Sequence, residues 1–157
     1  MDQRGFTYIE LIVTVTILAI LASVVIPLSE MSAKRSKEIE LKTSLRIIRH
    51  AIDEYKAASD SGKIDKDMGS TGYPEELSKL TEGLTDKSNK DFDNTIRFLR
   101  RIPRDPMNSD SYLSNEDTWG LRSYDSDAED PSEGDDVYDV YSKSSEVALD
   151  GTKYSDW

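Results

Sequence analysis

The chemically active side chains of this chain are mostly carboxylates. There are 31 Asp and Glu against 20 Lys and Arg, with one His and no Cys. Without cysteine, a phosphate-binding glycine loop or a paired-histidine motif, the sequence indicates no nucleophile and no transition-metal site. His50 lies among Lys and Arg residues of a helical segment, where a solvated or packing role is expected. We therefore expect no enzyme, and hard cations such as Ca²⁺ are the ligands that carboxylates alone would suit.

One carboxylate, that of Glu10, stands at the start of a long apolar run. No charged residue occurs from Leu11 to Leu28. A helix from Phe6 to Leu28 would be roughly 34 Å long at about 1.5 Å per residue, enough to cross a hydrocarbon core of about 30 Å. A carboxylate in a membrane span costs on the order of 2–3 kcal/mol even on lenient insertion scales. Glu10 therefore needs a partner or a purpose.

Three interpretations compete for this apolar segment. A secretory signal peptide would have a shorter apolar core, without a carboxylate in it and with a small-residue cleavage site beyond it. A plain single-span anchor fits the length but explains neither Glu10 nor the Gly5-Phe6 junction. The segment from Gly5 to Val13, preceded by the basic Arg4, closely resembles the class III signal of type IV pilin-like proteins. This third interpretation accounts for all of these features.

The resemblance assigns roles to individual residues. It implies that a prepilin peptidase cuts after Gly5 on the cytoplasmic side, removes the leader 1–5 and methylates the new amino terminus at Phe6. It also implies that the Glu10 carboxylate pairs with the Phe6 amine of a neighbouring subunit during assembly. Such a pair is strong in a low dielectric, and an unpaired charge there is costly. A proline at Pro27 is typical of the family, and a kink is expected there because the ring clashes with the Ser23 carbonyl.

A domain must follow the span, and its first element is an amphipathic helix. Leu41, Leu45, Ile48, Ile52 and Tyr55 recur at spacings of three and four, which predicts one buried stripe on a helix continuing to about Ala58. A stop is expected at 59–62, where Gly62 follows polar residues. The stretch 31–38 is expected to be an exposed neck.

The rest of the chain predicts short elements and two motifs. Tyr73 to Leu80 predicts a short proline-started helix, and 96–102 an apolar patch. Strands are expected at 119–124 and 137–142, giving a small antiparallel sheet of two to four strands across the helix. The acid-rich loop 125–136 is expected to have no structure of its own. A Tyr-Pro-x-x-Leu-x-x-Leu segment at 73–80, followed by Pro-x-Asp-Pro at 103–106, resembles the major pseudopilins of type II secretion.

The same resemblance implies a calcium site in the tail. In those pseudopilins a loop after a Tyr-x-x-x-Ser strand, here Tyr138 to Ser142, holds one Ca²⁺. Carried over, the ligands would be the Lys143 carbonyl and the side chains of three acids: Glu146, Asp150 and Asp156. The family's Gly-x-Asp-Gly is absent after this strand, so the alternative is that Asp150-Gly151 is only a turn and Asp156 a surface acid.

Together these observations predict an α+β, pilin-like protein. We expect a leader (1–5), a transmembrane and assembly helix (6–28), and a periplasmic domain (29–157), in a single-pass protein of the bacterial inner membrane. Lys34, Arg35 and Lys37 oppose this orientation by the positive-inside rule, but the cleavage signal must face a cytoplasmic peptidase. The net charge of −11 argues against nucleic-acid binding.

The function expected from the resemblance is that of a major pseudopilin. It would polymerise into the short periplasmic filament of a type II secretion system and support export of folded proteins across the outer membrane. Its partners would be the prepilin peptidase, further copies of itself in a helical filament, minor pseudopilins and the inner-membrane assembly platform. The alternatives are a pilin of a type IV pilus, and a single-span membrane protein whose acidic domain binds a ligand or calcium.

Overall fold

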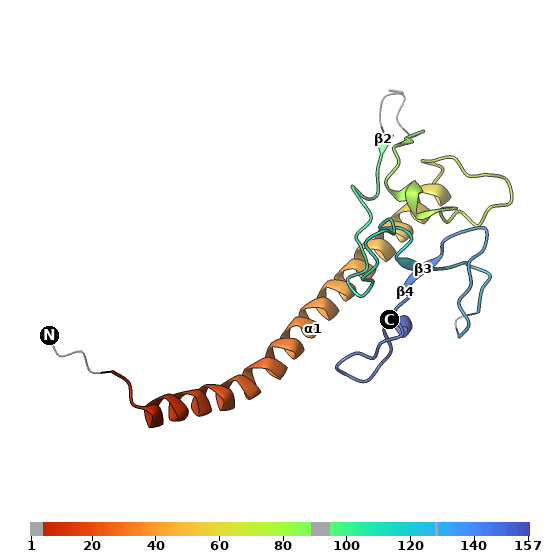
Figure 1. Cartoon of the computed structure of the whole chain (residues 1–157). Helices are drawn as coiled ribbons and strands as arrows, with labels where there is room; N and C mark the ends of the chain where they lie inside the picture. Colours follow the sequence, from red (N-terminus) through yellow and green to blue (C-terminus); the bar gives the residue numbers. More distant parts are fainter. Residues whose placement is uncertain (1–4, 89–94, 128) are drawn as a thin grey trace. The chain divides into compact units, whose positions relative to one another are not determined.

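The computed structural model describes residues 5–88, 95–127 and 129–157, and it has an α+β architecture (Figure 1). Within these residues, one long helix is followed by 3₁₀ turns and short antiparallel strands. The elements are α1 (Tyr8–Asp60), η1 (Leu77–Leu80), β1 (Leu84–Thr85), β2 (Thr95–Ile96), β3 (Trp119–Arg122), β4 (Asp139–Ser142) and η2 (Tyr154–Asp156). The α+β, pilin-like class expected from the sequence is confirmed.

The chain divides into two compact units, residues 1–36 and 37–157, and α1 contributes to both. In the first unit α1 is long and apolar enough to cross a membrane. The large apolar side chains described there are exposed. The expected leader lies outside the described residues except for Gly5, and the expected boundary between 28 and 29 stays a prediction.

In the second unit α1 supplies one wall of the core. Leu41, Leu45, Ile48 and Ile52 are each at most 3% exposed, so the predicted stripe is confirmed. These residues pack in one cluster with Leu77 and Leu80 of η1, and with Trp119, Val140 and Tyr154 from the C-terminal half. The fifth residue of the stripe, Tyr55, is half-buried and packs on Phe98 with ring centroids 5.3 Å apart. The stripe thus holds segments from the whole domain.

Helix α1 ends at Asp60, two residues after the expected Ala58 and within the stop predicted at 59–62. Gly62 has φ +69°, a left-handed conformation that glycine adopts without strain. The backbone N–H groups of Gly62 and Lys63 donate to the carbonyls of Ser59 (3.0 Å) and Ala58 (2.9 Å). These bonds satisfy carbonyls that the end of a helix leaves without intrahelical partners.

The predicted helix at 73–80 was too long. Only Leu77–Leu80 forms a 3₁₀ turn, and Glu76 before it is extended and gives no side-chain cap. The Pro74 carbonyl instead accepts a hydrogen bond of 2.7 Å from the N–H of Val137. This non-local contact keeps the start of the segment out of a helix.

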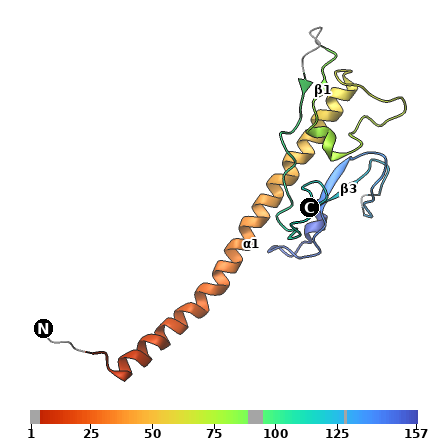
Figure 2. The same cartoon turned by 45° about the horizontal axis from the view of Figure 1, so that its top comes forward.

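The strands form separate two-stranded sheets rather than one sheet (Figures 1 and 2). β3 pairs with β4 in antiparallel register, with Trp119 opposite Ser142 and Gly120 opposite Tyr141. This is the pair that the sequence predicted. β1 and β2 form a second antiparallel pair, which the sequence did not indicate because each strand has only two residues.

The acidic loop 125–136 has turns and bends but no helix or strand in its described residues, as expected. Its ends are nevertheless fixed. The buried Asp136 carboxylate accepts hydrogen bonds from the Tyr124 N–H (2.8 Å) and from the Thr71 hydroxyl. The Ser123 N–H donates to the Ser132 carbonyl at 3.0 Å. The loop therefore has a defined base and an exposed acidic tip.

Candidate functional site

The start of α1 is a reciprocal capping box built from Thr7 and Glu10. The Glu10 Oε2 atom accepts hydrogen bonds from the Thr7 N–H (3.0 Å) and the Thr7 hydroxyl (2.9 Å). In return, the Glu10 N–H donates to the Thr7 hydroxyl oxygen at 3.3 Å. This arrangement satisfies backbone donors that the first turn of a helix leaves without intrahelical partners.

The capping box gives Glu10 a partner inside its own chain. The family resemblance implies a partner only on a neighbouring subunit and does not indicate Thr7. The spacing Thr-x-x-Glu before an apolar run is itself a capping-box signal and would have identified the contact. The carboxylate is also placed one residue from Phe6, because it binds the N–H of Thr7. An amine created at Phe6 would therefore arise next to it.

The two residues at the expected cleavage point lie before the helix. Gly5 and Phe6 have no helical structure, and the Phe6 side chain is 87% exposed. A Cβ atom built on Gly5 meets no described atom within 4 Å, so packing in the described part of the chain does not require glycine there. The predicted roles of Gly5 and Phe6 in processing stay predictions.

Pro27 lies inside α1, and the helix continues on both sides of it. Because proline has no N–H, the Ser23 carbonyl loses its usual partner four residues on. The Ser23 hydroxyl donates to the Ile20 carbonyl at 2.7 Å, one turn earlier. The expected kink and the assembly role of Pro27 stay predictions.

The C-terminal tail is held by Glu38, a residue of the stretch predicted to be an exposed neck. Its Oε1 atom accepts a hydrogen bond from the Leu149 N–H (2.8 Å) and another from the Tyr154 hydroxyl (2.9 Å). Tyr154 is fully buried, and burial together with the Glu38 hydrogen bond raises its pKa to about 12. The neck is thus exposed only in part. No local sequence pattern indicates a contact between residues more than 110 positions apart.

Trp157 completes this anchor. Its ring meets that of Tyr154 edge-on with centroids 5.1 Å apart, and its indole N–H donates to the Thr152 hydroxyl at 2.6 Å. The Lys42 ammonium lies 4.0 Å from the centre of the Trp157 ring. A cation over an aromatic face is attracted by the ring quadrupole. These contacts hold the C-terminal end against α1 in a chain that has no cysteine.

The Pro-x-Asp-Pro segment and the Tyr-x-x-x-Ser strand, which both resemble the pseudopilins, meet in the core. Asp105 of the Pro-x-Asp-Pro segment and Ser142 at the end of β4 are both fully buried. The Ser142 hydroxyl donates to Asp105 Oδ2 at 2.6 Å, and the Met107 N–H donates to Oδ1 at 2.8 Å. The Asp105 N–H donates to the Thr118 hydroxyl at 3.2 Å. The motif aspartate is therefore a structural hydrogen-bond acceptor that ties the segment to the strand.

The residues expected to bind calcium occupy the tail without forming a cage. Asp150 Oδ1 accepts hydrogen bonds from the Thr152 hydroxyl (2.7 Å) and the Thr152 N–H (3.0 Å). These bonds, the one from the side chain first, lower the pKa of Asp150 below its ordinary value. Gly151 has φ +89°, so Asp150-Gly151 is indeed a turn. Glu146 and Asp156 are exposed, and the exposed Lys143 side chain donates to the Asp117 carbonyl at 3.2 Å.

In the part of the chain that the structure describes, no three His, Cys, Asp or Glu residues lie close enough to hold a metal ion. The calcium site implied by the resemblance therefore stays a prediction. Ca²⁺ needs six to eight oxygen atoms and accepts backbone carbonyls and water among them. An ion at this turn would have to rely on those oxygens.

Comparison with known proteins agrees with the geometry at the N-terminus. Residues 1–26 match the family model described as the prokaryotic N-terminal methylation motif. The chain is 30% identical over 115 residues to the type II secretion system core protein G of Vibrio cholerae, covering 71% of each protein. It is 27% identical over 116 residues to the Escherichia coli protein of the same name, covering 72% of each. No solved structure gives a significant match.

A third relative of the same name, from Klebsiella pneumoniae, is 27% identical over 114 residues, which are 71% of this chain and 74% of that protein. The matched N-terminal motif implies processing by a prepilin peptidase. The chain belongs to the family of type II secretion system core protein G, the major pseudopilins.

Proposed function

We propose that this chain is the major subunit of a short periplasmic filament, the pseudopilus, in a type II secretion system. In this role it is anchored in the inner membrane by α1, its C-terminal domain lies in the periplasm, and its filament supports export of folded proteins across the outer membrane. The peptidase, further copies of the chain, minor pseudopilins and the inner-membrane assembly platform are its partners. Family membership and the capped apolar helix support this proposal.

The observation that carries the proposal is the position of Glu10. Its carboxylate lies at the first turn of an apolar helix and binds the N–H next to Phe6. Cleavage after Gly5 would place a positive amine beside a negative carboxylate in a medium of low dielectric. There the attraction between opposite charges is far greater than in water. A second subunit can exchange these partners, so that its amine binds this Glu10 and the helices align in one register.

Two other functions are less well supported. A pilin of a type IV pilus would share the N-terminal motif, but the relatives that match over the domain are named as secretion-system core proteins. A single-span anchor with a ligand-binding domain would need neither Glu10 nor the Gly5-Phe6 junction. The chain is not an enzyme, since its family consists of structural subunits.

The first test is the intact mass of the full chain extracted from membranes of cells with an active prepilin peptidase. We expect the loss of Met1 to Gly5 and the gain of one methyl group at Phe6. A bulkier residue at Gly5 should block cleavage and leave membrane insertion unchanged. Recovery of the uncleaved mass from the wild-type chain would contradict the proposal.

The second test separates the two roles of Glu10. Glu10→Gln keeps an oxygen that can accept from Thr7 but removes the charge, whereas Thr7→Val weakens the capping box and keeps the charge. We expect processed, membrane-inserted Glu10→Gln chains that do not form filaments when expressed with the secretion genes. The Thr7→Val chains should still assemble. Filaments of normal yield from Glu10→Gln would show that the charge pair is not required.

A further inference from the structure

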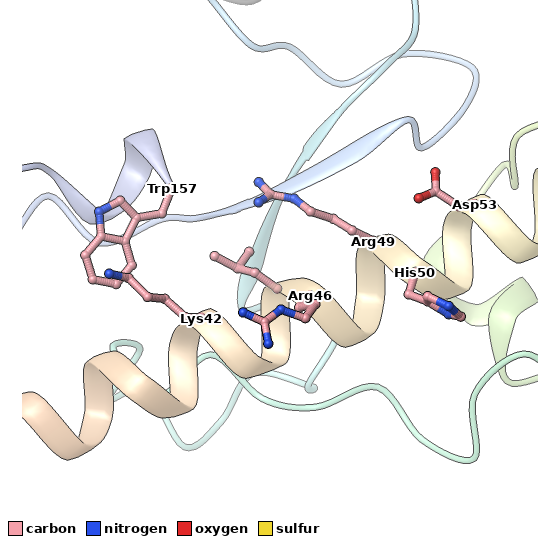
Figure 3. Close-up of a pocket in the computed structure, with 7 residues that line it drawn as sticks. Lys42, Arg46, Arg49, His50, Asp53 and Trp157 are labelled. Carbon is pink, nitrogen blue, oxygen red and sulfur yellow. The ribbon is translucent and has the colours of Figure 1, made fainter.

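A groove along α1 in residues 37–157 has no assigned role. Its volume is about 540 Å³, and it lies between the helix and the C-terminal Trp157. Its lining includes one carboxylate, that of Asp53, and four basic side chains: Lys42, Arg46, Arg49 and His50. Figure 3 shows them along one stretch of the helix, with Lys42 beside the Trp157 ring. Cavities of about 300–1,000 Å³ hold a drug-sized molecule, so this groove has room for a few side chains of a partner.

The basic side chains of the groove differ in how far they already have partners within the chain. Arg49 is bound to the Asp139 carboxylate at 2.6 Å, and His50 lies 3.7 Å from Glu54. Arg46 is exposed, and within the described residues it forms no hydrogen bond or ion pair. Arg46 therefore keeps its full capacity for a carboxylate, which a guanidinium binds with two parallel hydrogen bonds.

The opposite charge lies on another part of the same domain. No Lys or Arg occurs from Ser123 to Ser142. The described tip of the acidic loop exposes six carboxylates, those of Asp125, Asp127, Glu129, Asp130, Glu133 and Asp135. Across the described parts of the chain, none of these six forms an ion pair. Glu129 lines an adjoining pocket together with Arg49 and Trp157, but no residue of the loop lines the groove around Arg46 itself.

We propose that the groove around Arg46 binds the acidic loop 125–135 of a second copy of this chain. The proposal rests on the proposed function, because it names a contact between subunits of the filament. Every copy carries both surfaces at different places, so the contact is heterologous, and a heterologous contact that does not close into a ring produces a helical filament. Complementary charge would guide the approach and fix which copy faces which. It would also lessen the mutual repulsion of chains with a net charge of −11.

The absence of cysteine allows a direct test in the full chain. Two differently tagged chains, Arg46→Cys and Glu133→Cys, are expressed together with the secretion genes, and the membranes are treated with a mild oxidant. We expect a disulfide-linked heterodimer on a non-reducing gel. The control pairs Arg46→Cys with Tyr112→Cys, a position that is 98% exposed and lies outside both surfaces. It should give several-fold less heterodimer.

Charge reversal provides the second measurement. Arg46→Glu should lower filament yield several-fold, and adding Glu133→Arg to the same chain should restore part of it. An unchanged melting temperature of the Arg46→Glu chain in detergent shows that the domain is folded.

The outcomes separate this proposal from the proposed function. Normal filaments of the cysteine chains without excess of the Arg46–Glu133 heterodimer would overturn the groove contact and leave the pseudopilus role intact. A cross-link from Arg46→Cys to a different protein alone would assign the groove to another acidic partner and would also overturn it. Absence of filaments from the wild-type chain as well as of the heterodimer would overturn both.

Discussion

Glu38 offers the sharpest test of how a cysteine-free tail is held. Glu38→Ala removes the acceptor of two hydrogen bonds, from the Leu149 N–H and the Tyr154 hydroxyl. A hydrogen bond to a charged group stabilises a fold by about 1.5–3 kcal/mol, and a buried donor without a partner costs about 1–3 kcal/mol. Since Glu38 itself is only half-buried, we expect a loss of about 2–3 kcal/mol in the free energy of unfolding.

The measurement is thermal unfolding of the full chain in detergent. Unfolding is monitored by near-ultraviolet circular dichroism, a signal to which Trp157 and Tyr154 contribute. For a domain of this size the loss corresponds to a decrease of about 5–10 °C in melting temperature. Glu40→Ala is the matched control, because Glu40 is an exposed glutamate of the same helix. Exposed substitutions of this kind usually change stability by about 0.5 kcal/mol or less. The melting temperature of Glu38→Gln should lie between those of Glu38→Ala and Glu40→Ala, because glutamine keeps a hydrogen-bond acceptor but loses the charge.

Equal melting temperatures for Glu38→Ala and Glu40→Ala would refute the reasoning. A double-mutant cycle with Tyr154→Phe adds a finer test. If the two side chains act through one hydrogen bond, Glu38→Ala should cost less in the Tyr154→Phe background than in the wild type.

Three further predictions concern the same domain. Because the folded pKa of Tyr154 is raised from about 10 to about 12, its contribution to stability is complete below pH 10 and is lost as the pH rises towards 12; tyrosinate absorbance and pH-dependent unfolding should show this loss, and Tyr154→Phe should lack it. Millimolar calcium should raise the melting temperature of the full chain more than magnesium does. This calcium effect should be absent in Asp150→Ala and weakened in Glu146→Ala and Asp156→Ala. An equal rise from sodium chloride at matched ionic strength would instead indicate screening. Gly120→Ala should destabilise the β3–β4 pair by about 1–3 kcal/mol in denaturant unfolding, because a Cβ there would clash with the Tyr141 ring; wild-type stability would contradict this packing.

The parts of the fold that the sequence predicted are those set by local pattern. The stripe from Leu41 to Ile52 follows from helical periodicity, the helix end from Gly62, and β3 and β4 from alternating aromatic and β-branched residues. Each of these signals lies within a few residues of the element it specifies. The Thr7–Glu10 capping box is equally local and was missed only because Glu10 had already been assigned a partner on another subunit.

The parts that the sequence did not predict depend on contacts between distant segments. Glu38 meets Tyr154 across 116 residues, and Asp105 meets Ser142 across 37. Neither residue type nor spacing indicates such pairs, because a glutamate or aspartate without a distant partner can stand in the same local sequence pattern. The calcium ligands expected from the family pattern, Glu146, Asp150 and Asp156, stay a prediction. The local geometry shows that Asp150 also accepts a hydrogen bond from Thr152 in a turn.

The capping box has a consequence for how readily subunits enter and leave a filament. Before assembly the Glu10 carboxylate is already hydrogen-bonded to Thr7, so an incoming amine must replace existing bonds. The free energy gained on docking is then the difference between two sets of contacts, which is smaller than the full value of a buried ion pair. A small difference shortens the lifetime of the docked state. If the chain assembles as proposed, such a subunit has no unsatisfied charge while it is in the bilayer, and its docking is more readily reversed.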